Sequence, residues 1–293
     1  MNRSSSRDFI ADASDATLDA CVIDLVSDSR NRLTPIELKR RIRQAHRPIQ
    51  RGRVESSIRR LVEQKELVYT YQFGNSFLEP SFEKPVRVTN AIVLKPPDCD
   101  YRAVPGEVVI NIKPGAAFGT GCHPTTRLSL LGLERVCRAY VSKKPGGRVL
   151  DIGTGSGVLA IAALKFGMAQ GIGLDIDPCA RTEASDNADL NGLGHCLEIS
   201  DLSLDSMDGR FGMVLANLRL PTLVAYFNRM SGLTETGGFL IVSGIKSNEI
   251  KTLKGVGNRH DMKTLWEDTA LGWGGMVFSR RETTASMAVS YTH

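Results

Sequence analysis

Apolar residues in the first part of the chain, residues 1–80, recur at helical spacing in three separate runs. The first run, DATLDACVIDLVSD, and the third, RVESSIRRLVEQKEL, each keep their apolar residues on one face of a helix. The second run, LTPIELKRRIRQA, opens with Thr34, Pro35 and Glu37 in the order of an N-cap, a first-turn proline and a capping-box acid. The pattern therefore predicts three short helices.

A stretch of strand-forming residues follows these helices. In LVYTYQFGNSFLEP, Gly74 and Asn75 lie between two runs of Val, Tyr and Phe, which predicts a β-hairpin. Three helices and a hairpin resemble a winged helix-turn-helix, with the helix that starts at Arg53 in the recognition position. Winged helices also dock proteins, so the fold alone does not decide between a nucleic-acid and a protein partner. The side chains expected to face outward on this helix are Ser56, Ser57, Arg59, Arg60 and Gln64.

Strand and helix patterns alternate from Thr125 to Arg281, which is typical of a parallel sheet covered by helices. Before this region, VRVTNAIVL and EVVINI are rich in strand formers. We therefore divide the chain into four parts. They are a winged-helix-like α+β domain (1–80), linking strands and a glycine-rich lid (81–118), a Rossmann-like α/β domain (119–281) and an unstructured tail (282–293).

The bulk composition excludes several classes of protein. No apolar run approaches the roughly 18 residues of a membrane helix, and the hydrophobic fraction of 42% suits a globular chain. The opening MNRSSSRDFIADASD lacks the apolar core of a secretion signal, so we expect a cytoplasmic protein. Six scattered cysteines without a C-x-x-C pair favour free thiols and argue against a metal site.

The net charge of +5 is unevenly distributed along the chain. Between Ser29 and Lys65 there are twelve Lys or Arg residues and only three Glu. Such a segment favours an anionic partner, most commonly nucleic acid, although a solvated basic surface without a partner explains it as well. In a nucleic-acid complex the arginines expected at phosphates are Arg51, Arg53, Arg59 and Arg60.

The strongest chemical motif is GRVLDIGTGSGVLAIAALKFG. It predicts a buried strand, a turn containing Gly153, Gly155 and Gly157, and a helix whose N–H groups face a ligand at the turn. In the later GLDIDP, Asp175 ends the next strand, where a carboxylate can accept both hydroxyls of a ribose. Asp177 competes for that role, but it precedes a proline and suits a helix N-cap better.

A dinucleotide-binding fold shares this glycine loop, since Gly155, Gly157 and Ala160 fit G-x-G-x-x-A loosely. Asp151, at the end of the first strand, favours a different ligand. Its carboxylate would repel a pyrophosphate and attract a cationic ligand with a free amino group, such as S-adenosylmethionine. The alternative role for Asp151 is to cap its own glycine turn.

Six segments in order carry a resemblance to a known family: GAAFGTGCHPTT, VLDIGTGSGVLAIAALKFG, GLDIDP, DNADLNG, VLANLRLP and GWGGMVFSR. From Val86 to Arg281 the chain resembles the ribosomal protein L-eleven methyltransferases, the PrmA-like family. The resemblance implies a class I methyltransferase fold that uses S-adenosylmethionine. It also implies cofactor contacts at Thr126, Gly153, Asp175 and Asn217.

On this interpretation, the glycines between Gly115 and Gly121 let the loop close over the cofactor, and Phe118 shields the sulfonium from water. The hydroxyls and N–H groups at the start of the following helix, including Thr126, suit the methionine carboxylate. We expect His123 to be an N-cap or a packed structural histidine rather than a catalytic group.

Asn217 ends the fourth strand in VLANLRLP, at the edge where open α/β sheets bind ligands. Its amide and the next carbonyl would hold a nucleophilic amine, which makes it the candidate catalytic residue. The sequence Asn217-Leu218-Arg219-Leu220 lacks the Pro-Pro-aromatic run of DNA adenine methyltransferases, and Arg219 departs from the aliphatic residue expected in the L-eleven family. Asp201 follows the third strand and is either an adenine contact or a surface turn.

The resemblance implies methylation of a protein amine, on a lysine or an N-terminus, with a ribosomal protein as a candidate acceptor. The family's own N-terminal domain presents the ribosomal protein, and residues 1–80 do not match it, so the acceptor stays open. Two alternatives remain. One is a nucleic-acid-binding regulator whose methyltransferase-like domain senses the cofactor, and the other is a small-molecule methyltransferase. The basic segment favours a macromolecular partner over the small molecule.

Overall fold

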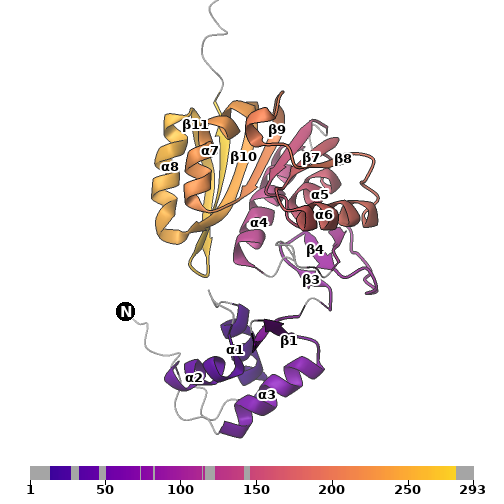
Figure 1. Ribbon diagram of the computed structural model, residues 1–293, viewed down its shortest axis with the longest axis vertical. Coiled ribbons are helices and arrows are strands. Elements are labelled where there is room, and N and C mark those ends of the chain that lie inside the picture. Colours follow the sequence, from indigo (N-terminus) through magenta and orange to yellow (C-terminus); the bar gives the residue numbers. More distant parts are fainter. Residues whose placement is uncertain are drawn as a thin grey trace, which may run out of the picture. The chain divides into compact units, whose positions relative to one another are not determined.

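The computed structural model describes residues 14–27, 33–45, 51–72, 74–81, 83–113, 115, 123–141 and 146–281. The chain divides into two compact units, residues 1–84 and 85–293 (Figure 1). In the described part of the chain, no helix combines the length and apolar character needed to cross a membrane.

The first unit contains the three helices and the hairpin that the hydrophobic pattern predicts. Its elements are α1 (Asp15–Ser27), α2 (Pro35–Ala45), α3 (Arg51–Glu63), β1 (Leu67–Gln72) and β2 (Asn75–Pro80). The Thr34 hydroxyl accepts a hydrogen bond from the Glu37 amide at 3.2 Å, which caps α2 as expected. Leu18, Leu38 and Ile58 belong to one buried core that the helices and the hairpin share. Assignment of this unit to the winged-helix class remains a prediction.

The outward orientation predicted for Ser57 is wrong. Its side chain is fully buried, and its hydroxyl donates to Asp19 on α1. Arg60 also turns toward α1, where its Nε and Nη2 atoms each donate to the Asp19 carboxylate at 2.7 Å. Because α1 packs against this face of α3, the polar residues there pair with each other instead of facing solvent. Ser56, Arg59 and Gln64 are exposed as predicted.

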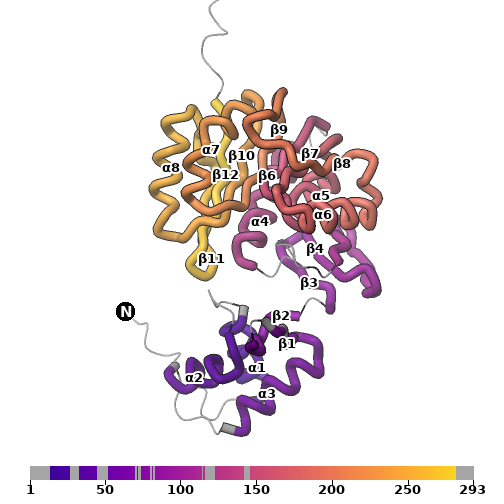
Figure 2. The backbone as a smooth tube through the Cα atoms, viewed as in Figure 1, coloured from indigo at the N-terminus to yellow at the C-terminus, as the bar shows by residue number. Residues whose placement is uncertain are grey.

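The second unit contains two sheets. The smaller one has the order β3-β4-β5, and the larger one has the order β11-β12-β10-β9-β6-β7-β8 (Figure 2). In the larger sheet, β10, β9, β6, β7 and β8 are parallel, and β12 and β11 extend it as antiparallel strands. The strands are β3 (Val86–Arg87), β4 (Ile92–Lys95), β5 (Val108–Asn111), β6 (Arg148–Ile152), β7 (Gln170–Leu174), β8 (Leu197–Ser200), β9 (Phe211–Asn217), β10 (Thr234–Lys246), β11 (Met262–Ala270) and β12 (Trp273–Arg280).

Helices cover both faces of the larger sheet, as a Rossmann-like fold requires. They are α4 (Pro124–Ala139), α5 (Val158–Lys165), α6 (Pro178–Leu190), α7 (Leu220–Leu233) and α8 (Ile250–Arg259). Leu240 of β10 shares a core with residues of α7 and α8. The next residue, Ile241, faces Gly132 of α4. Since successive strand residues point to opposite faces, α4 lies across the sheet from α7 and α8.

Gly244 allows the chain after β9 to approach β10 closely. It has φ +87°, and a Cβ atom there would lie 2.5 Å from the Leu218 carbonyl oxygen. Gly244→Ala therefore combines left-handed strain with a backbone clash. We expect the strain to lower the free energy of unfolding by about 1–3 kcal/mol, and the clash to lower it further, as measured by chemical denaturation.

The matched control is Gly232→Ala in α7, where an added Cβ would contact nothing within 4 Å. This helical substitution should stabilise the protein by roughly 0.5–1 kcal/mol. Equal unfolding free energies for Gly244→Ala and the unmodified chain would contradict the close approach.

Candidate active site

Three adjacent parallel strands end at the same level of the larger sheet. Ile152 of β6 pairs with Leu174 of β7 on one side and with Ala216 of β9 on the other. The residues that follow these three are Gly153, Asp175 and Asn217. The strand register therefore brings a glycine turn, a carboxylate and an amide to one edge of the sheet, where open α/β sheets bind ligands.

The predicted glycine turn between strand and helix is present, and its backbone is left-handed at all three glycines. Gly153, Gly155 and Gly157 have φ values of +69°, +55° and +80°, and Gly157 is the N-cap of α5. The amides of Gly153 and Thr154 donate to the Leu174 carbonyl, which ties the turn to β7. The N-terminus of α5 consequently opens at the edge of the sheet, with its amides available to a ligand.

Asp151 is fully buried beneath this turn. Its Oδ2 atom accepts hydrogen bonds from the Thr154 hydroxyl at 2.8 Å and the Ala160 amide at 3.3 Å, so it does cap the turn. Its Oδ1 atom is also buried but has no hydrogen-bond partner among the described residues. Burial, with a smaller effect from the nearby Asp175, raises the pKa of Asp151 to about 7. A cationic hydrogen-bond donor at Oδ1 would give this oxygen a partner and would stabilise the ionised form of the buried carboxylate.

Asp175 and Asp177 divide their roles as expected for the helix cap. Asp177 is the N-cap of α6 and accepts from the Cys179 amide at 2.9 Å. Asp175 is half-buried, and its two oxygens accept from the amides of Gly155 at 2.9 Å and Asp177 at 3.0 Å. Each oxygen keeps a second lone pair. The carboxylate thus anchors the glycine turn and retains acceptor capacity for a ligand.

The start of α4 contributes a second buried oxygen without a hydrogen-bond partner among the described residues. His123 is the N-cap, with its Nδ1 atom 2.8 Å from the Thr125 hydroxyl and its ring against Trp273 at a centroid distance of 5.1 Å. Burial lowers the pKa of His123, which favours the neutral ring. These contacts agree with the structural role predicted for it. Thr126 is buried, and its hydroxyl has no partner in the described part of the chain.

Asn217 presents a third unsatisfied atom at the same edge. Its Oδ1 atom is buried and finds no hydrogen-bond partner among the described residues. The next residue, Leu218, donates its amide to the Ser243 carbonyl at 3.1 Å, and its side chain fills the space over Gly153. The backbone after Asn217 is therefore fixed, while its amide oxygen is left for a ligand.

Asp201 lies at the outer part of this edge. Its side chain is 71% exposed and forms an ion pair with Arg181 at 3.6 Å. Arg181 also donates to the carbonyls of Asp175 and Ile176. The exposure and the ion pair fit the surface-turn alternative, and the adenine contact remains a prediction.

Two exposed aliphatic residues at this edge were not identified from the sequence. Ile176 is 93% exposed and Leu202 is 51% exposed. They follow Asp175 and Asp201, just past strand ends that pair through Leu174 and Ser200. Large apolar side chains that are exposed beside the polar residues of a site can pack against a flat aromatic ring of a ligand. In the sequence, each of the two residues directly follows an aspartate at a strand end, and this position is the signal that could have identified them.

The DNADLNG motif links the glycine turn to the strand that leads into the predicted lid. Asn187 is buried, its Oδ1 atom accepts from the Lys113 amide, and its Nδ2 atom donates to the Ser156 carbonyl, both at 2.9 Å. Asn191 pairs with both the N–H and the carbonyl of Asn111. Residues 116–122 lie outside the described residues, and with them the role predicted for Phe118.

Comparison with known proteins places these features in one family. The model described as "Ribosomal protein L11 methyltransferase (PrmA)" matches residues 80–280. A curated relative named ribosomal protein L11 methyltransferase, from Citrifermentans bemidjiense, is 43% identical over 162 residues, which cover 55% of this chain and 53% of the relative. One of the same name from Alkaliphilus oremlandii is 35% identical over 197 residues, covering 67% of this chain and 61% of the relative.

A solved structure supports the same relationship. The crystal structure of ribosomal protein L11 methylase from Lactobacillus delbrueckii subsp. bulgaricus is 31% identical and has a TM-score of 0.61. The match covers 68% of this chain and 100% of that structure. By contrast, the chain spans about half the length of the curated relatives that it matches.

The raised pKa of Asp151 leads to a pH-dependent stability. The folded carboxyl, with a pKa of about 7 against the usual 3.8, binds more protons than the unfolded one between these values. Stability should therefore fall as the pH rises from about 4 through about 7, by up to about 1.36 kcal/mol per unit of pKa difference. Urea denaturation of the ligand-free protein at several pH values measures this slope.

Asp151→Asn should remove much of that slope because the amide does not titrate in this range. Asp177→Asn, at an exposed helix N-cap, is the matched control and should keep the slope. If unmodified protein and Asp151→Asn show the same pH dependence, Asp151 does not carry this linkage.

Proposed function

This chain belongs to the ribosomal protein L11 methyltransferase (PrmA) family, and from that membership we propose that it is an S-adenosylmethionine-dependent enzyme that methylates an amine of a protein. The acceptor amine belongs to a lysine or an N-terminus, and a ribosomal protein is the candidate acceptor. A ribosomal acceptor places the reaction in the cytoplasm.

The observation that carries the proposal is a set of buried oxygens without partners. Asp151 Oδ1, Thr126 Oγ1 and Asn217 Oδ1 are each buried and unpaired among the described residues. A buried polar atom without a hydrogen bond costs about 1–3 kcal/mol, so these three, at two strand ends and the start of α4, favour a ligand that supplies their partners. One is a carboxylate oxygen, which suits an ammonium group far better than the phosphates of a dinucleotide.

The residues at the edge of the sheet fit S-adenosylmethionine in parts. Asp151 suits the ammonium group, and the hydroxyl of Thr126 at the α4 N-terminus suits the carboxylate. Asp175 retains lone pairs for the ribose hydroxyls, and Ile176 and Leu202 offer apolar faces for the adenine. The turn at Gly153, Gly155 and Gly157 lets the ligand approach the backbone, and Asp201 is the peripheral candidate contact. When bound, this cofactor supplies an electrophilic methyl group.

The chain's own task is then to prepare the acceptor amine. A lysine amine with a pKa near 10.4 is neutral at pH 7 only at a cost of roughly 4.6 kcal/mol. Burial of the amine reduces that cost because desolvation disfavours the ammonium form. Asn217 Oδ1 accepts a hydrogen bond from an N–H of the neutral amine, which orients the nitrogen lone pair toward the methyl group. Buried His123 serves as the N-cap of α4 and takes no proton in this scheme.

The nucleic-acid alternative receives less support from the described residues. Arg53 forms an ion pair with Asp15, and Arg60 pairs with Asp19 and Asp15. Two of the four arginines expected at phosphates are thus engaged with carboxylates of the same unit. The side chain of Arg51 lies outside the described residues. We therefore place protein ahead of nucleic acid as the macromolecular partner.

Transfer of a tritiated methyl group tests the proposed function directly. The protein is incubated with methyl-tritiated S-adenosylmethionine and one of three acceptors: purified ribosomal protein L11, intact large ribosomal subunits, or protein-free ribosomal RNA. We expect acid-stable label in protein and none in RNA. Label confined to RNA would contradict the acceptor class, and binding of NADH without S-adenosylmethionine would contradict the cofactor.

Removal of the Asp175 carboxylate should weaken cofactor binding. Asp175→Ala should raise the calorimetric dissociation constant for S-adenosylmethionine by the equivalent of about 1.5–3 kcal/mol, the range for a hydrogen bond to a charged group. Asp175→Asn keeps one acceptor oxygen for the Gly155 amide and should lose less. Asp208→Ala, in an exposed loop, is the control and should bind normally. An unchanged constant for Asp175→Ala would remove the ribose contact.

Asn217 should affect turnover more than cofactor affinity. At saturating cofactor, Asn217→Ala should lower the methylation rate at least about tenfold, because the amine loses the acceptor that orients it. Asn258→Ala, on the exposed side of α8, should keep the full rate. Equal rates for Asn217→Ala and unmodified enzyme would exclude Asn217 from the chemistry.

A further inference from the structure

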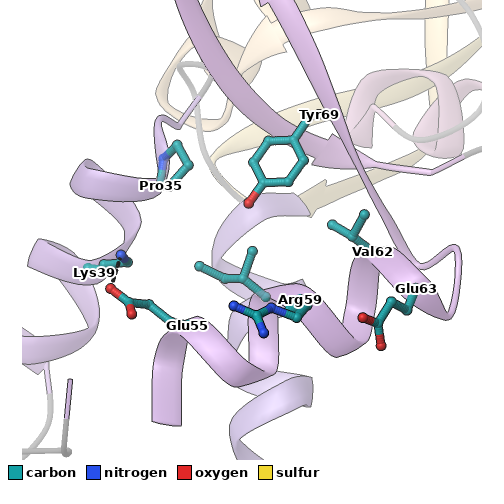
Figure 3. A pocket seen from close by; sticks show the side chains of 8 residues that line it. Pro35, Lys39, Glu55, Arg59, Val62, Glu63 and Tyr69 are labelled. Atoms are coloured by element: carbon teal, nitrogen blue, oxygen red, sulfur yellow. Dashed lines mark hydrogen bonds and ion pairs between the residues drawn. The ribbon is translucent and has the colours of Figure 1, made fainter. Parts of the chain in front are cut away.

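The first unit has a pocket of its own between α2, α3 and β1 (Figure 3). Ile58 is buried and Val62 half-buried on the α3 side, and Pro35 lines the pocket from α2. Tyr69 enters from β1 with its hydroxyl directed toward α3 (Figure 3), and it is 49% exposed. The pocket thus has an apolar floor under a half-exposed phenol.

The polar groups around this floor are only partly satisfied. Lys39 and Glu55 form an ion pair at one end, drawn as a dashed line in Figure 3. The hydrogen bond from Lys39 and, to a smaller extent, the charge of nearby Arg59 lower the pKa of Glu55. Within the described residues, neither Arg59 nor the Tyr69 hydroxyl forms a hydrogen bond or a close ion pair. Glu63, at the other end, is likewise unpaired in the described part. A cation and a hydroxyl donor therefore converge on an apolar floor with a free carboxylate beside them.

We propose that this pocket binds a segment of a partner protein in which an acidic side chain stands next to an aliphatic or aromatic one. The partner's carboxylate accepts from the Arg59 guanidinium and the Tyr69 hydroxyl. Its apolar neighbour packs on Ile58 and Val62, and Glu63 favours a basic side chain further along the segment. Arginine and tyrosine beside an apolar floor are typical anchors of protein interfaces.

Charge complementarity favours a peptide over a nucleic acid here. A phosphate backbone passing over Arg59 would meet the carboxylates of Glu55 and Glu63, which line the same pocket. Two of the nearby described cations are already paired, Arg40 with Glu37 and Arg60 with Asp19. A single carboxylate flanked by apolar and basic groups matches this mixed surface, whereas a polyanion does not.

Exposed apolar side chains extend the surface beyond the pocket. Ile36, next to Pro35 on α2, is 79% exposed, and Tyr71 is 74% exposed. Tyr71 and Tyr69 are two residues apart on β1, so they share one face of the strand. Exposed aromatic and aliphatic groups beside a pocket of mixed charge are what a protein segment buries on docking.

Selection of peptides on the full chain tests this site independently of methyl transfer. A phage-displayed random dodecapeptide library is panned on immobilised full-length protein and, in parallel, on Arg59→Gln. We expect enriched peptides that share an acidic residue beside an apolar one, and no such enrichment on Arg59→Gln. The leading peptide is then synthesised with a fluorophore, and its dissociation constant is measured by fluorescence anisotropy.

The variants give a graded outcome. Arg59→Gln should weaken the leading peptide at least tenfold and Tyr69→Phe severalfold. Arg135→Gln, at an exposed arginine of α4 that does not line the pocket, should leave the affinity unchanged. Replacing the peptide's acidic residue with its amide should cost less affinity on Arg59→Gln than on the unmodified chain, since the contact with Arg59 is already absent there and the amide oxygen still accepts from Tyr69.

Two results would overturn the proposal. One is the absence of enrichment, or enrichment of peptides that bind Arg59→Gln as well as the unmodified chain. The other is displacement of the peptide by a 20-base-pair DNA duplex whose own binding depends on Arg59, because the pocket would then belong to a nucleic-acid surface. Thermal unfolding of each variant separates loss of binding from loss of fold.

Discussion

The candidate site of the second unit depends on one buried carboxylate, that of Asp151. A carboxylate lies fully buried at the end of the central strand β6, with one oxygen committed to its own turn and the other without a partner in the described residues. Burial, with a smaller effect from Asp175, raises its pKa to about 7. A buried charge of this kind persists where function requires it, because an apolar residue in the same place would stabilise the ligand-free fold more.

The elements around Asp151 serve to hold a ligand against it. Parallel register aligns the ends of β6, β7 and β9, and Asp175 holds the glycine turn through the Gly155 amide. Asn187 joins that turn to the backbone at Lys113. The site therefore consists of short contacts between neighbouring strand ends, which fix its geometry before any ligand arrives and reduce the cost of binding.

In the first unit, the main electrostatic constraint is repulsion between like charges. Its helices carry a high density of Lys and Arg, which would repel one another in a compact domain. Asp15 and Asp19 of α1 and Glu37 and Glu55 of α2 and α3 pair with many of them. Within the described residues, part of the positive charge seen in the sequence is thereby engaged in ion pairs. What remains is a pocket of mixed charge, which changes the kind of partner that the unit favours.

The sequence by itself determined the features that depend on neighbours in the chain. These features are the three helices and the hairpin, the capping role of Thr34 and Asp177, and the glycine turn, and they follow from residue spacing within one turn or strand. The family resemblance across Val86–Arg281 is confirmed by the match of the family model to residues 80–280. The sequence also placed Asp175 and Asn217 at the ends of strands in a parallel sheet, and the strand register of the structure aligns those ends.

Only the tertiary structure decided which polar groups find partners. The helical pattern predicted that Ser57 and Arg60 face outward. In the structure both donate hydrogen bonds to Asp19, which lies about forty positions earlier in the chain. The same holds for the unpaired oxygens of Asp151 and Asn217 and for the pocket at Arg59 and Tyr69. Hydrogen bonds, ion pairs and desolvation act over a few ångströms in space. Their partners come from distant parts of the chain, so periodicity along the sequence does not contain them.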